Sequence, residues 1–134
     1  MSHLTKVELS VSNLDALAAA AKELGGALER NCKTFDAYTR NQPCTHRITV
    51  PGINYQIGVR QETDGTYSLH MDNYGYDSSR HDGHKLTAQF GQGLTKLRQY
   101  YGVHTATQAA RKKGWMVQRT TLPNGTMRLQ CTGM

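Results

Sequence analysis

Three successive segments in the middle of the chain alternate apolar and polar residues, and this pattern restricts the fold more than any other feature. The segments cover residues 46–50, 53–60 and 66–71. Pro51-Gly52 separates the first two, and Asp64-Gly65 separates the second from the third. Period-two alternation interrupted by turn residues predicts a three-stranded antiparallel meander with one buried face.

The N-terminal segment predicts a further strand followed by a helix. Residues 5–11 alternate in the same way, and leucine and alanine then recur at helical spacing from Leu14 to Leu24. Ser12-Asn13-Leu14-Asp15 has the form of a capping box, which predicts that Ser12 begins the helix. Gly25-Gly26 can supply the left-handed residue that ends it.

Two stretches between these elements are less regular. Residues 27–31 predict a short strand, whereas Gln42-Pro43 predicts a break in regular structure because proline has no backbone N–H. Residues 72–83, DNYGYDSSRHDG, lack apolar periodicity and are rich in turn-forming residues. This composition predicts a long surface loop, and loops of such length often serve a function or move.

The C-terminal half predicts two helices and a hairpin. An apolar stripe indicates one helix over residues 84–101, Gly102 interrupts the stripe, and a capping box at residues 105–108 begins a short second helix that ends at Gly114. Residues 115–121 and 126–131 predict a hairpin closed by Asn124-Gly125, with Trp115 in the core. We therefore expect residues 1–134 to form a single α+β domain, with about three helices on one face of a largely antiparallel sheet.

Charge is distributed unevenly along the chain. The formal net charge is +6, but residues 1–67 hold seven basic and seven acidic residues. The 52 residues from Gly83 onward hold eight basic residues and no acidic residue. This asymmetry predicts a positive surface that attracts a polyanion or an acidic partner, although a solvated surface that only maintains solubility would show the same composition.

Nucleic-acid or nucleotide binding requires cations for phosphates and planar groups for bases, and the C-terminal half contains both. Two tyrosines that flank Gly75 lie in the expected loop, and the cations follow them along the chain. The expected ligand-binding residues are Tyr74, Tyr76, Arg80, Lys96, Arg98, Arg111, Lys112 and Lys113. No helix-turn-helix, zinc-finger or phosphate-loop motif accompanies them.

The histidine pattern gives little support for a metal site. His81 and His84 are spaced so that they share a helical face, and Asp77 or His104 would have to supply a third zinc ligand. Surface histidines without a ligand are the commoner case. We therefore expect no metal and no cofactor.

The cysteines indicate neither a disulfide framework nor a strong catalytic motif. Cys44 stands two residues before His46, which could activate a thiolate, but no oxyanion-hole motif accompanies the pair. Cys32, Cys44 and Cys131 are odd in number and widely spaced, which predicts free thiols in a reducing compartment. A non-enzymatic role is favoured over catalysis.

Three segments resemble a known family. They are SHLTKVELSVSNLDALAAAAKELG near the start, FGQGLTKLRQYYGVHTATQAARKKGW in the helical region, and PNGTMRLQC near the end. They are similar to the conserved chloroplast and cyanobacterial reading-frame-35 family, a domain of unknown function also found in other bacteria and in phages. The resemblance implies a small α+β protein of the cytoplasm or stroma, and it brings no established activity.

The sequence predicts a soluble binding protein without a membrane partner. No run approaches the roughly 18 apolar residues of a membrane span, and the N-terminus lacks the apolar core of a signal peptide. We expect a cytoplasmic location: the host cytoplasm if a phage encodes the chain, or the stroma if a plastid does. The basic C-terminal half is expected to engage nucleic acid or a phosphorylated small molecule. The alternative is an assembly subunit that docks on an acidic protein partner or forms a homo-oligomer.

Overall fold

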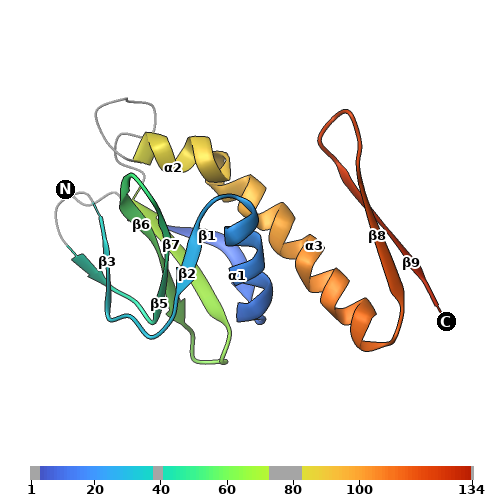
Figure 1. The fold of residues 1–134 in the computed structure, drawn as a ribbon. Helices are drawn as coiled ribbons and strands as arrows, with labels where there is room; N and C mark the ends of the chain where they lie inside the picture. Colours follow the sequence, from blue (N-terminus) through green and yellow to red (C-terminus); the bar gives the residue numbers. More distant parts are fainter. Residues whose placement is uncertain (1–3, 38–40, 73–82, 134) are drawn as a thin grey trace.

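The computed structural model describes residues 4–37, 41–72 and 83–133 (Figure 1). The elements, in chain order, are β1 (Leu4–Val11), α1 (Leu14–Glu23), β2 (Ala27–Glu29), β3 (Thr34–Asp36), β4 (Asn41–Pro43), β5 (His46–Val50), β6 (Ile53–Gln61), β7 (Tyr67–Asp72), α2 (Gly83–Phe90), the 3-10 turn η1 (Gln92–Leu94), α3 (Thr95–Lys112), β8 (Met116–Thr121) and β9 (Met127–Thr132). Within these residues, no helix is both long and apolar enough to cross a membrane.

Five strands form the main sheet, in the spatial order β1-β7-β6-β5-β2, and every neighbouring pair is antiparallel. The meander β5-β6-β7 and the short strand β2 confirm the predictions made from alternation. Figure 1 shows the helices gathered on one side of this sheet. The predicted α+β class, with an antiparallel sheet and helices packed against it, is therefore confirmed.

The core lies between the main sheet and the helices, because the alternating apolar residues of the strands all face that way. Fully buried members from the sheet are Val11, Ile48, Ile57, Val59 and Leu69, and those from the helical layer are Leu17, Leu86, Phe90, Leu94 and Leu97. Burying each such side chain contributes about 1.5–3 kcal/mol relative to leaving it exposed.

Helix α1 begins at Asn13 rather than at Ser12, which corrects the predicted capping box. The Asn13 side-chain oxygen accepts a hydrogen bond from the Ala16 N–H at 3.0 Å. The Asn13 amide also donates to Gln108 of α3 at 2.9 Å, and the Tyr101 hydroxyl accepts from the Ser12 N–H at 3.1 Å. The start of α1 is therefore fixed by residues nearly 90 positions away, a contact that no local motif records.

The opposite face of the sheet is covered in part by the small antiparallel hairpin β3–β4. Its Phe35 is completely buried against Gly58 of β6, and the Arg60 guanidinium lies 5.8 Å from the Phe35 ring centre. The predicted break at Gln42-Pro43 is wrong, because these residues form β4. Proline is tolerated there since β4 pairs on one side only, and the Pro43 carbonyl accepts from the Arg60 Nε at 2.8 Å.

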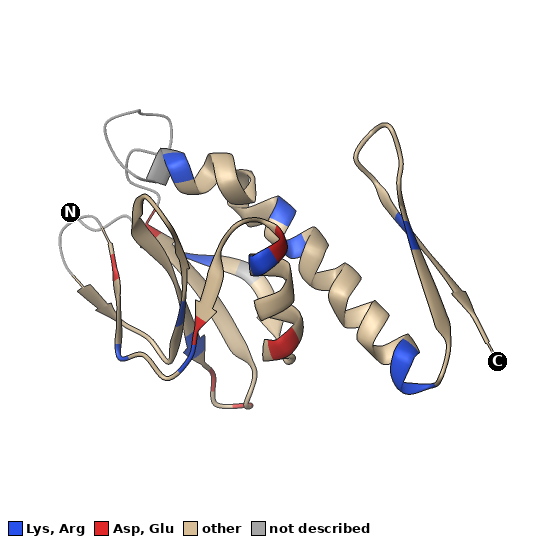
Figure 2. Ribbon diagram, in the orientation of Figure 1, with Lys and Arg blue, Asp and Glu red and all other residues tan. Residues whose placement is uncertain are grey.

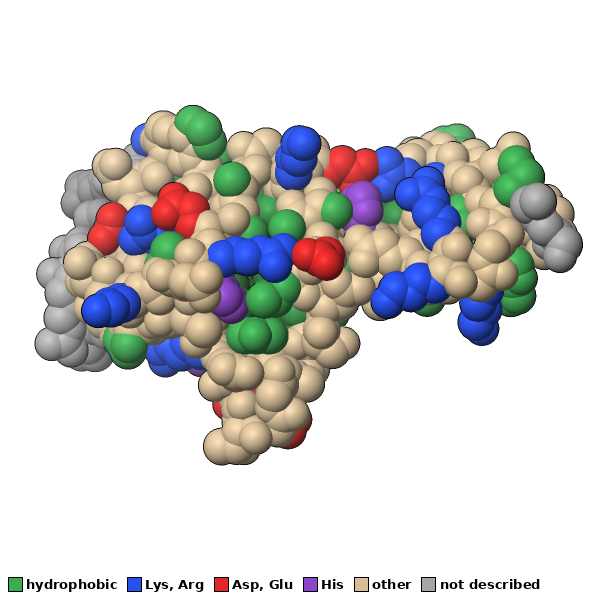
Figure 3. Space-filling model, turned by 60° about the horizontal axis from the view of Figure 1, so that its bottom comes forward, with side chains coloured by type: hydrophobic (Ala, Val, Ile, Leu, Met, Phe, Trp, Pro, Cys, Tyr) green, Lys and Arg blue, Asp and Glu red, His purple; other side chains and the backbone are tan. Residues whose placement is uncertain are grey.

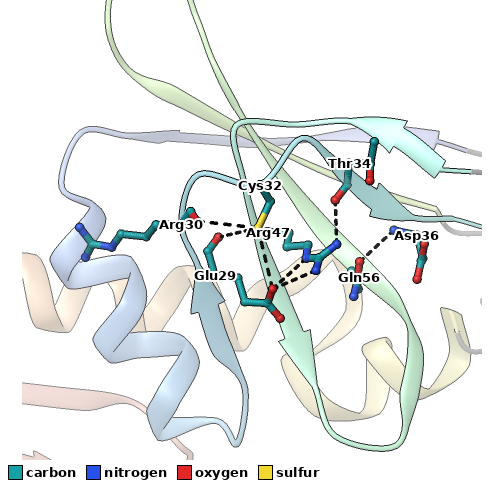
Figure 4. A network of polar contacts seen from close by, with 7 residues as sticks. All are labelled: Glu29, Arg30, Cys32, Thr34, Asp36, Arg47 and Gln56. Carbon is teal, nitrogen blue, oxygen red and sulfur yellow. Dashed lines mark hydrogen bonds and ion pairs between the residues drawn. The ribbon is translucent and has the colours of Figure 1, made fainter.

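Polar contacts fasten β3 to the main sheet (Figure 4). Arg47 of β5 donates through Nε and Nη2 to one Glu29 carboxylate oxygen, at 3.1 and 2.9 Å, and through Nη1 to the Thr34 carbonyl at 3.0 Å. The Asp36 N–H donates to the Gln56 side-chain oxygen at 2.9 Å. Because Arg47 bonds both β2 and β3, one side chain holds two elements in place across the sheet.

The helix predicted over residues 84–101 is divided in two. Gly91, Gly93 and Leu94 all have positive φ angles, of 86°, 64° and 59°, so the chain turns sharply between α2 and α3. Leu94 accepts the left-handed conformation, which is unfavourable for a leucine, while its side chain is fully buried in the core. The same apolar stripe continues across the turn, which is why periodicity alone did not reveal it.

Helix α3 continues to Lys112, so the predicted interruption at Gly102 and the second capping box are wrong. Gly102 lies in an ordinary helical turn on an exposed face. The Thr105 hydroxyl donates to the Tyr101 carbonyl at 2.8 Å, one turn earlier, instead of capping a new helix. Gly114, with φ of 80°, follows the helix end, as predicted.

The C-terminal hairpin β8–β9 forms as predicted, but it is a separate two-stranded sheet and adds no strand to the main one. Figure 1 shows it lying beside α3, away from the main sheet. Trp115, expected in the core, is 40% exposed at the start of the hairpin, and the Lys113 ammonium lies 5.1 Å from its ring centre. The hairpin therefore packs on the surface of α3 and contributes no residue to the hydrophobic core.

Candidate anion-binding groove between α3 and the C-terminal hairpin

One face of α3 and one face of the hairpin form the two walls of a groove, called here the hairpin groove. Its α3 wall consists of residues at helical spacing: Lys96, Gln99, Tyr100, His104, Thr107 and Arg111. Side chains alternate along β8, so Val117, Arg119 and Thr121 point to the α3 side. The groove is thus assembled by two simple periodicities, 3.6 along the helix and two along the strand.

Two hollows lie along the hairpin groove. The tip hollow, about 490 Å³, is bounded by Lys96 and Tyr100 on α3 and by Asn124 and Met127 on the hairpin. The stem hollow, about 190 Å³, is lined by His104, Thr107, Arg111, Val117 and Arg119. The tip hollow mixes apolar, amide and aromatic groups, whereas the stem hollow is dominated by groups that donate to anions.

Three residues, Glu23, His104 and Arg119, hold the hairpin against the helices, and we call them the clasp. Both Arg119 terminal nitrogens donate to the Glu23 carboxylate, one of them at 3.1 Å. His104 Nε2 lies 2.8 Å from the same carboxylate. The Arg119 guanidinium also lies 6.0 Å from the Tyr100 ring centre. At the tip, the Gln99 amide donates to the Gly125 carbonyl at 3.1 Å, so the walls are tied at two points.

The clasp shifts the titration of its own charges. The hydrogen bonds from Arg119 hold the pKa of the Glu23 carboxyl below its ordinary value, against the opposing effect of burial, and His104 adds to the shift. The same hydrogen bonds raise the pKa of Arg119. Glu23 is therefore ionised at neutral pH and its charge is matched by Arg119, which leaves the groove positive overall.

Replacing Glu23 with glutamine is expected to lower the free energy of unfolding by about 0.5–1 kcal/mol at neutral pH, the range of a partly solvated ion pair. Because the folded-state pKa is depressed, the pair stabilises the protein fully above the ordinary carboxyl value of 4.5 and progressively less as pH falls through the folded value. Urea unfolding from pH 7 to 3 measures the gap between wild type and variant. A gap that stays constant down to pH 3 would contradict the assignment.

Some of the predicted ligand-binding residues line the hairpin groove, and others lie outside it. Lys96 and Arg111 line the hairpin groove, whereas Arg98 is exposed elsewhere on α3. Lys112 and Lys113 are exposed at the helix end, outside the two hollows, with Lys113 placed over Trp115. Fifteen positions at 1.5 Å per residue separate Lys96 from Arg111 by about 22 Å along α3. The predicted loop residues Tyr74, Tyr76 and Arg80 lie outside the described residues.

The expected ligand-binding residues leave out the other groove residues, although Tyr100 and Arg119 belong to the mixed stretch of cations and aromatic rings in the C-terminal half. The omitted residues are Gln99, Tyr100, His104, Thr107 and Arg119. The helical residues of this set could have been found from their spacing, since they recur three, four and seven positions apart from Lys96 and Arg111. Alternation in the hairpin could have placed Arg119 on the same face as Val117. The clasp itself joins Glu23 to a residue 96 positions later, and no sequence pattern indicates that pairing.

The charged residues of α3 and the C-terminal hairpin are all positive. In Figure 2 the charged residues on α3 and the hairpin are all blue, and the red residues lie on other parts of the molecule. Figure 3 shows Lys and Arg side chains gathered over the C-terminal part of the surface, at the right, where red appears only at its border. Among the described residues, neither Lys96 nor Arg111 forms an ion pair with a carboxylate.

A second hollow region, about 400 Å³, lies where β1 meets the turn between β6 and β7. Lys6, which is the one lysine among its described lining residues, forms an ion pair with Glu62 at 2.9 Å, and Asp64 also lines the region. Lys6 also lowers the pKa of Glu62, so the carboxylate stays ionised. The described residues that line this region therefore leave no positive charge unmatched, and the hairpin groove is the better candidate for an anion site.

The described residues form no arrangement that supports catalysis or metal binding. Burial raises the pKa of the Cys44 thiol and lowers the pKa of His46, so the pair favours two neutral groups over a thiolate and an imidazolium. His46 Nδ1 accepts from the Asn31 N–H at 3.0 Å. In the described part of the chain no three His, Cys, Asp or Glu residues gather as metal ligands, and His104 belongs to the clasp. His81 and Asp77 lie outside that part.

The cysteines agree with the predicted free thiols: Cys32 and Cys44 are partly buried and Cys131 is exposed, each unbridged.

Comparison of the chain with protein-family models, with curated proteins and with solved structures found no match. The resemblance to the reading-frame-35 family therefore stays a prediction, and the geometry of the hairpin groove is the basis for the function proposed below.

Proposed function

We propose that this protein is a non-enzymatic binding module that holds a polyanion, either nucleic acid or a phosphorylated small molecule, in the hairpin groove. The observation that carries the proposal is that Lys96 and Arg111 line the two ends of the groove and pair with no carboxylate among the described residues. The Thr107 hydroxyl and the Arg119 guanidinium add donors in the stem hollow, where a phosphate would accept several hydrogen bonds.

The clasp gives the groove a preformed shape. Because Glu23 already orients Arg119, the guanidinium does not have to be ordered when a ligand binds, and less conformational entropy is lost. The absence of any acidic residue after residue 82 extends the positive field along the whole of α3 and the hairpin. Such a field raises the association rate of anions and makes it depend on ionic strength.

Replacing Arg111 with glutamine is expected to weaken binding of a labelled single strand of about 20 nucleotides roughly tenfold in low salt. With two unpaired cations in the groove, the logarithm of the binding constant should fall with the logarithm of salt at a slope of about −1.4, and loss of Arg111 should reduce that slope by about 0.7. Fluorescence anisotropy at several salt concentrations measures both.

Arg98→Gln is the matched control for Arg111→Gln. Both residues are exposed arginines of α3, and only Arg111 lines the groove. The control should keep its affinity within about threefold, because a charge outside the site contributes only through the screened long-range field. Equal losses in the two variants would show that binding depends on net charge alone and would contradict the proposed site.

An acidic protein partner is the second candidate, and it is favoured by a different observation. Trp115 and Met116 are 40% and 60% exposed, and Gly114 alone separates them from Lys112 and Lys113. Exposed aromatic and methionine side chains beside cations are typical of protein interfaces. Binding at that site would persist at moderate salt, because apolar contacts are not screened, whereas polyanion binding in the groove would fall steeply.

A further inference from the structure

We infer that the hairpin groove takes a single strand of nucleic acid about four to seven nucleotides long and excludes duplex; this inference rests on the polyanion-binding function proposed above. The first argument is size. The tip hollow, about 490 Å³, has the volume of a small-molecule pocket, and the stem hollow, about 190 Å³, is smaller, so neither has room for a duplex. The Gln99–Gly125 hydrogen bond and the Glu23–Arg119 ion pair tie the walls together, so no duplex enters between them.

The second argument is length. Lys96 and Arg111 are separated by about 22 Å along α3. Phosphates of one strand lie about 3.4 Å apart along the axis when the bases are stacked, and roughly twice as far apart when the strand is extended. A strand that reaches both cations therefore spans about three to six phosphate steps, beyond the reach of a single nucleotide.

The third argument is the order of chemical groups along the groove. The tip hollow offers the Tyr100 ring and Met127 for contact with a base, and the Asn124 side chain as a hydrogen-bonding group at its rim. The stem hollow offers the Arg111 guanidinium for a phosphate, with the Arg119 guanidinium, already paired with Glu23, beside it. A single strand presents both kinds of group, with unpaired bases free to leave the stack. A duplex would present its phosphates but keep its bases paired.

The test measures competition of unlabelled ligands against a labelled thymidine strand of about 12 nucleotides, with the full-length protein in low salt. The competitors are oligothymidylates of increasing length, a thymidine mononucleotide, a duplex of equal length, and heparin. Affinity is expected to rise with length up to about six nucleotides. For longer strands it should rise only slightly, because a longer strand offers more positions at which the same groove can bind. The duplex is expected to compete at least about tenfold more weakly than the single strand.

Tyr100→Leu separates base contact from phosphate contact. Leucine keeps an apolar side chain at this partly buried position but removes the ring, so binding of the single strand should weaken about fivefold to tenfold, with the salt slope unchanged. A thermal melt of the variant checks that it folds, and the length series on the unaltered protein tests the inference without it.

Equal competition by duplex or heparin, or a mononucleotide as effective as the long strands, would overturn the single-strand inference while leaving the proposed polyanion function intact. A protein that binds none of these anions in low salt would overturn both. An affinity that rises to a plateau near six nucleotides, combined with weak duplex binding, is the result that supports the inference.

Discussion

Replacing Gly58 with alanine is expected to lower the free energy of unfolding by about 3 kcal/mol, near the upper end for overpacking of a buried site. A Cβ atom at this position would lie 2.7 Å from the Phe35 Cζ atom and closer still to two other atoms of that ring. Real Cβ atoms do not approach an aromatic ring so closely. The ring would have to move off β6, and the Phe35 side chain, now fully buried, would become exposed.

The consequence of that movement extends beyond one residue. Phe35 is the buried residue of the three-residue strand β3, and polar contacts such as the Arg47 bond to the Thr34 carbonyl also join β3 to the sheet. Exposing a large aromatic side chain costs about 1.5–3 kcal/mol. The loss should therefore appear as a lower urea midpoint and as faster proteolysis of the β3–β4 segment.

Gly102→Ala is the matched control, since it adds the same methyl group to a glycine with open space around it. Gly102 lies in the interior of α3, and nothing lies within 4 Å of its added Cβ atom. Alanine there is expected to raise the free energy of unfolding by about 0.5–1 kcal/mol, because it reduces the entropy of the unfolded chain. A Gly58→Ala protein as stable as the wild type would show that Phe35 does not pack on β6.

The sequence predicted the elements whose patterns are long enough to repeat. Strands β5, β6 and β7 each show alternation, and Asn124-Gly125 marks the C-terminal turn, so these were found correctly. Strands β3 and β4 hold three residues each, too few for alternation to be distinguished from chance. The turn at Gly91–Leu94 was missed because the buried stripe on α2 lines up with that on α3, and a leucine there takes a conformation that sequence statistics disfavour.

The candidate site was predicted only in part, for a related reason. Composition identifies a basic segment, and Lys96 and Arg111 were selected on that ground, but composition does not show which cations share a face. Arg98 was selected as well, although it is exposed outside the groove. The second wall of the groove is the hairpin, and its position depends on the contacts of Arg119 with Glu23 and Tyr100. These residues are distant in the sequence, and no motif links them.

Ending the chain at Gly114 is expected to reduce the affinity for a single strand about a hundredfold or more while the rest of the protein still unfolds in one cooperative transition. The truncation removes one wall of the groove, including Arg119, Asn124 and Met127. Two lost contacts of about 1.4 kcal/mol each already correspond to a hundredfold change in the dissociation constant. Lys96 and Arg111 would remain, but without the hollows that hold a strand against them.

The folded core should survive this truncation, contrary to what a hairpin within the main sheet would require. No described residue of β8 or β9 is buried, and the core cluster ends with residues of α3. The truncation exposes part of Tyr100 and frees Glu23 and His104, which we place at a cost of about 1–3 kcal/mol. Circular dichroism during a thermal melt, together with anisotropy of the labelled strand, measures the two effects separately.

Arg128→Gln in the full-length chain distinguishes loss of the groove from loss of hairpin charge. Arg128 pairs with Thr120 in the β8–β9 register, on the face that points away from α3, whereas Arg119 points into the groove. Removing the Arg128 charge should change the affinity by less than about threefold, since it acts only through the screened field.

Tight binding by the truncated chain would place the anion site outside the groove, and a non-cooperative melt would make the hairpin part of the folding core. Lost binding with a retained melt would show that the hairpin contributes a wall to the binding site but is not required for folding.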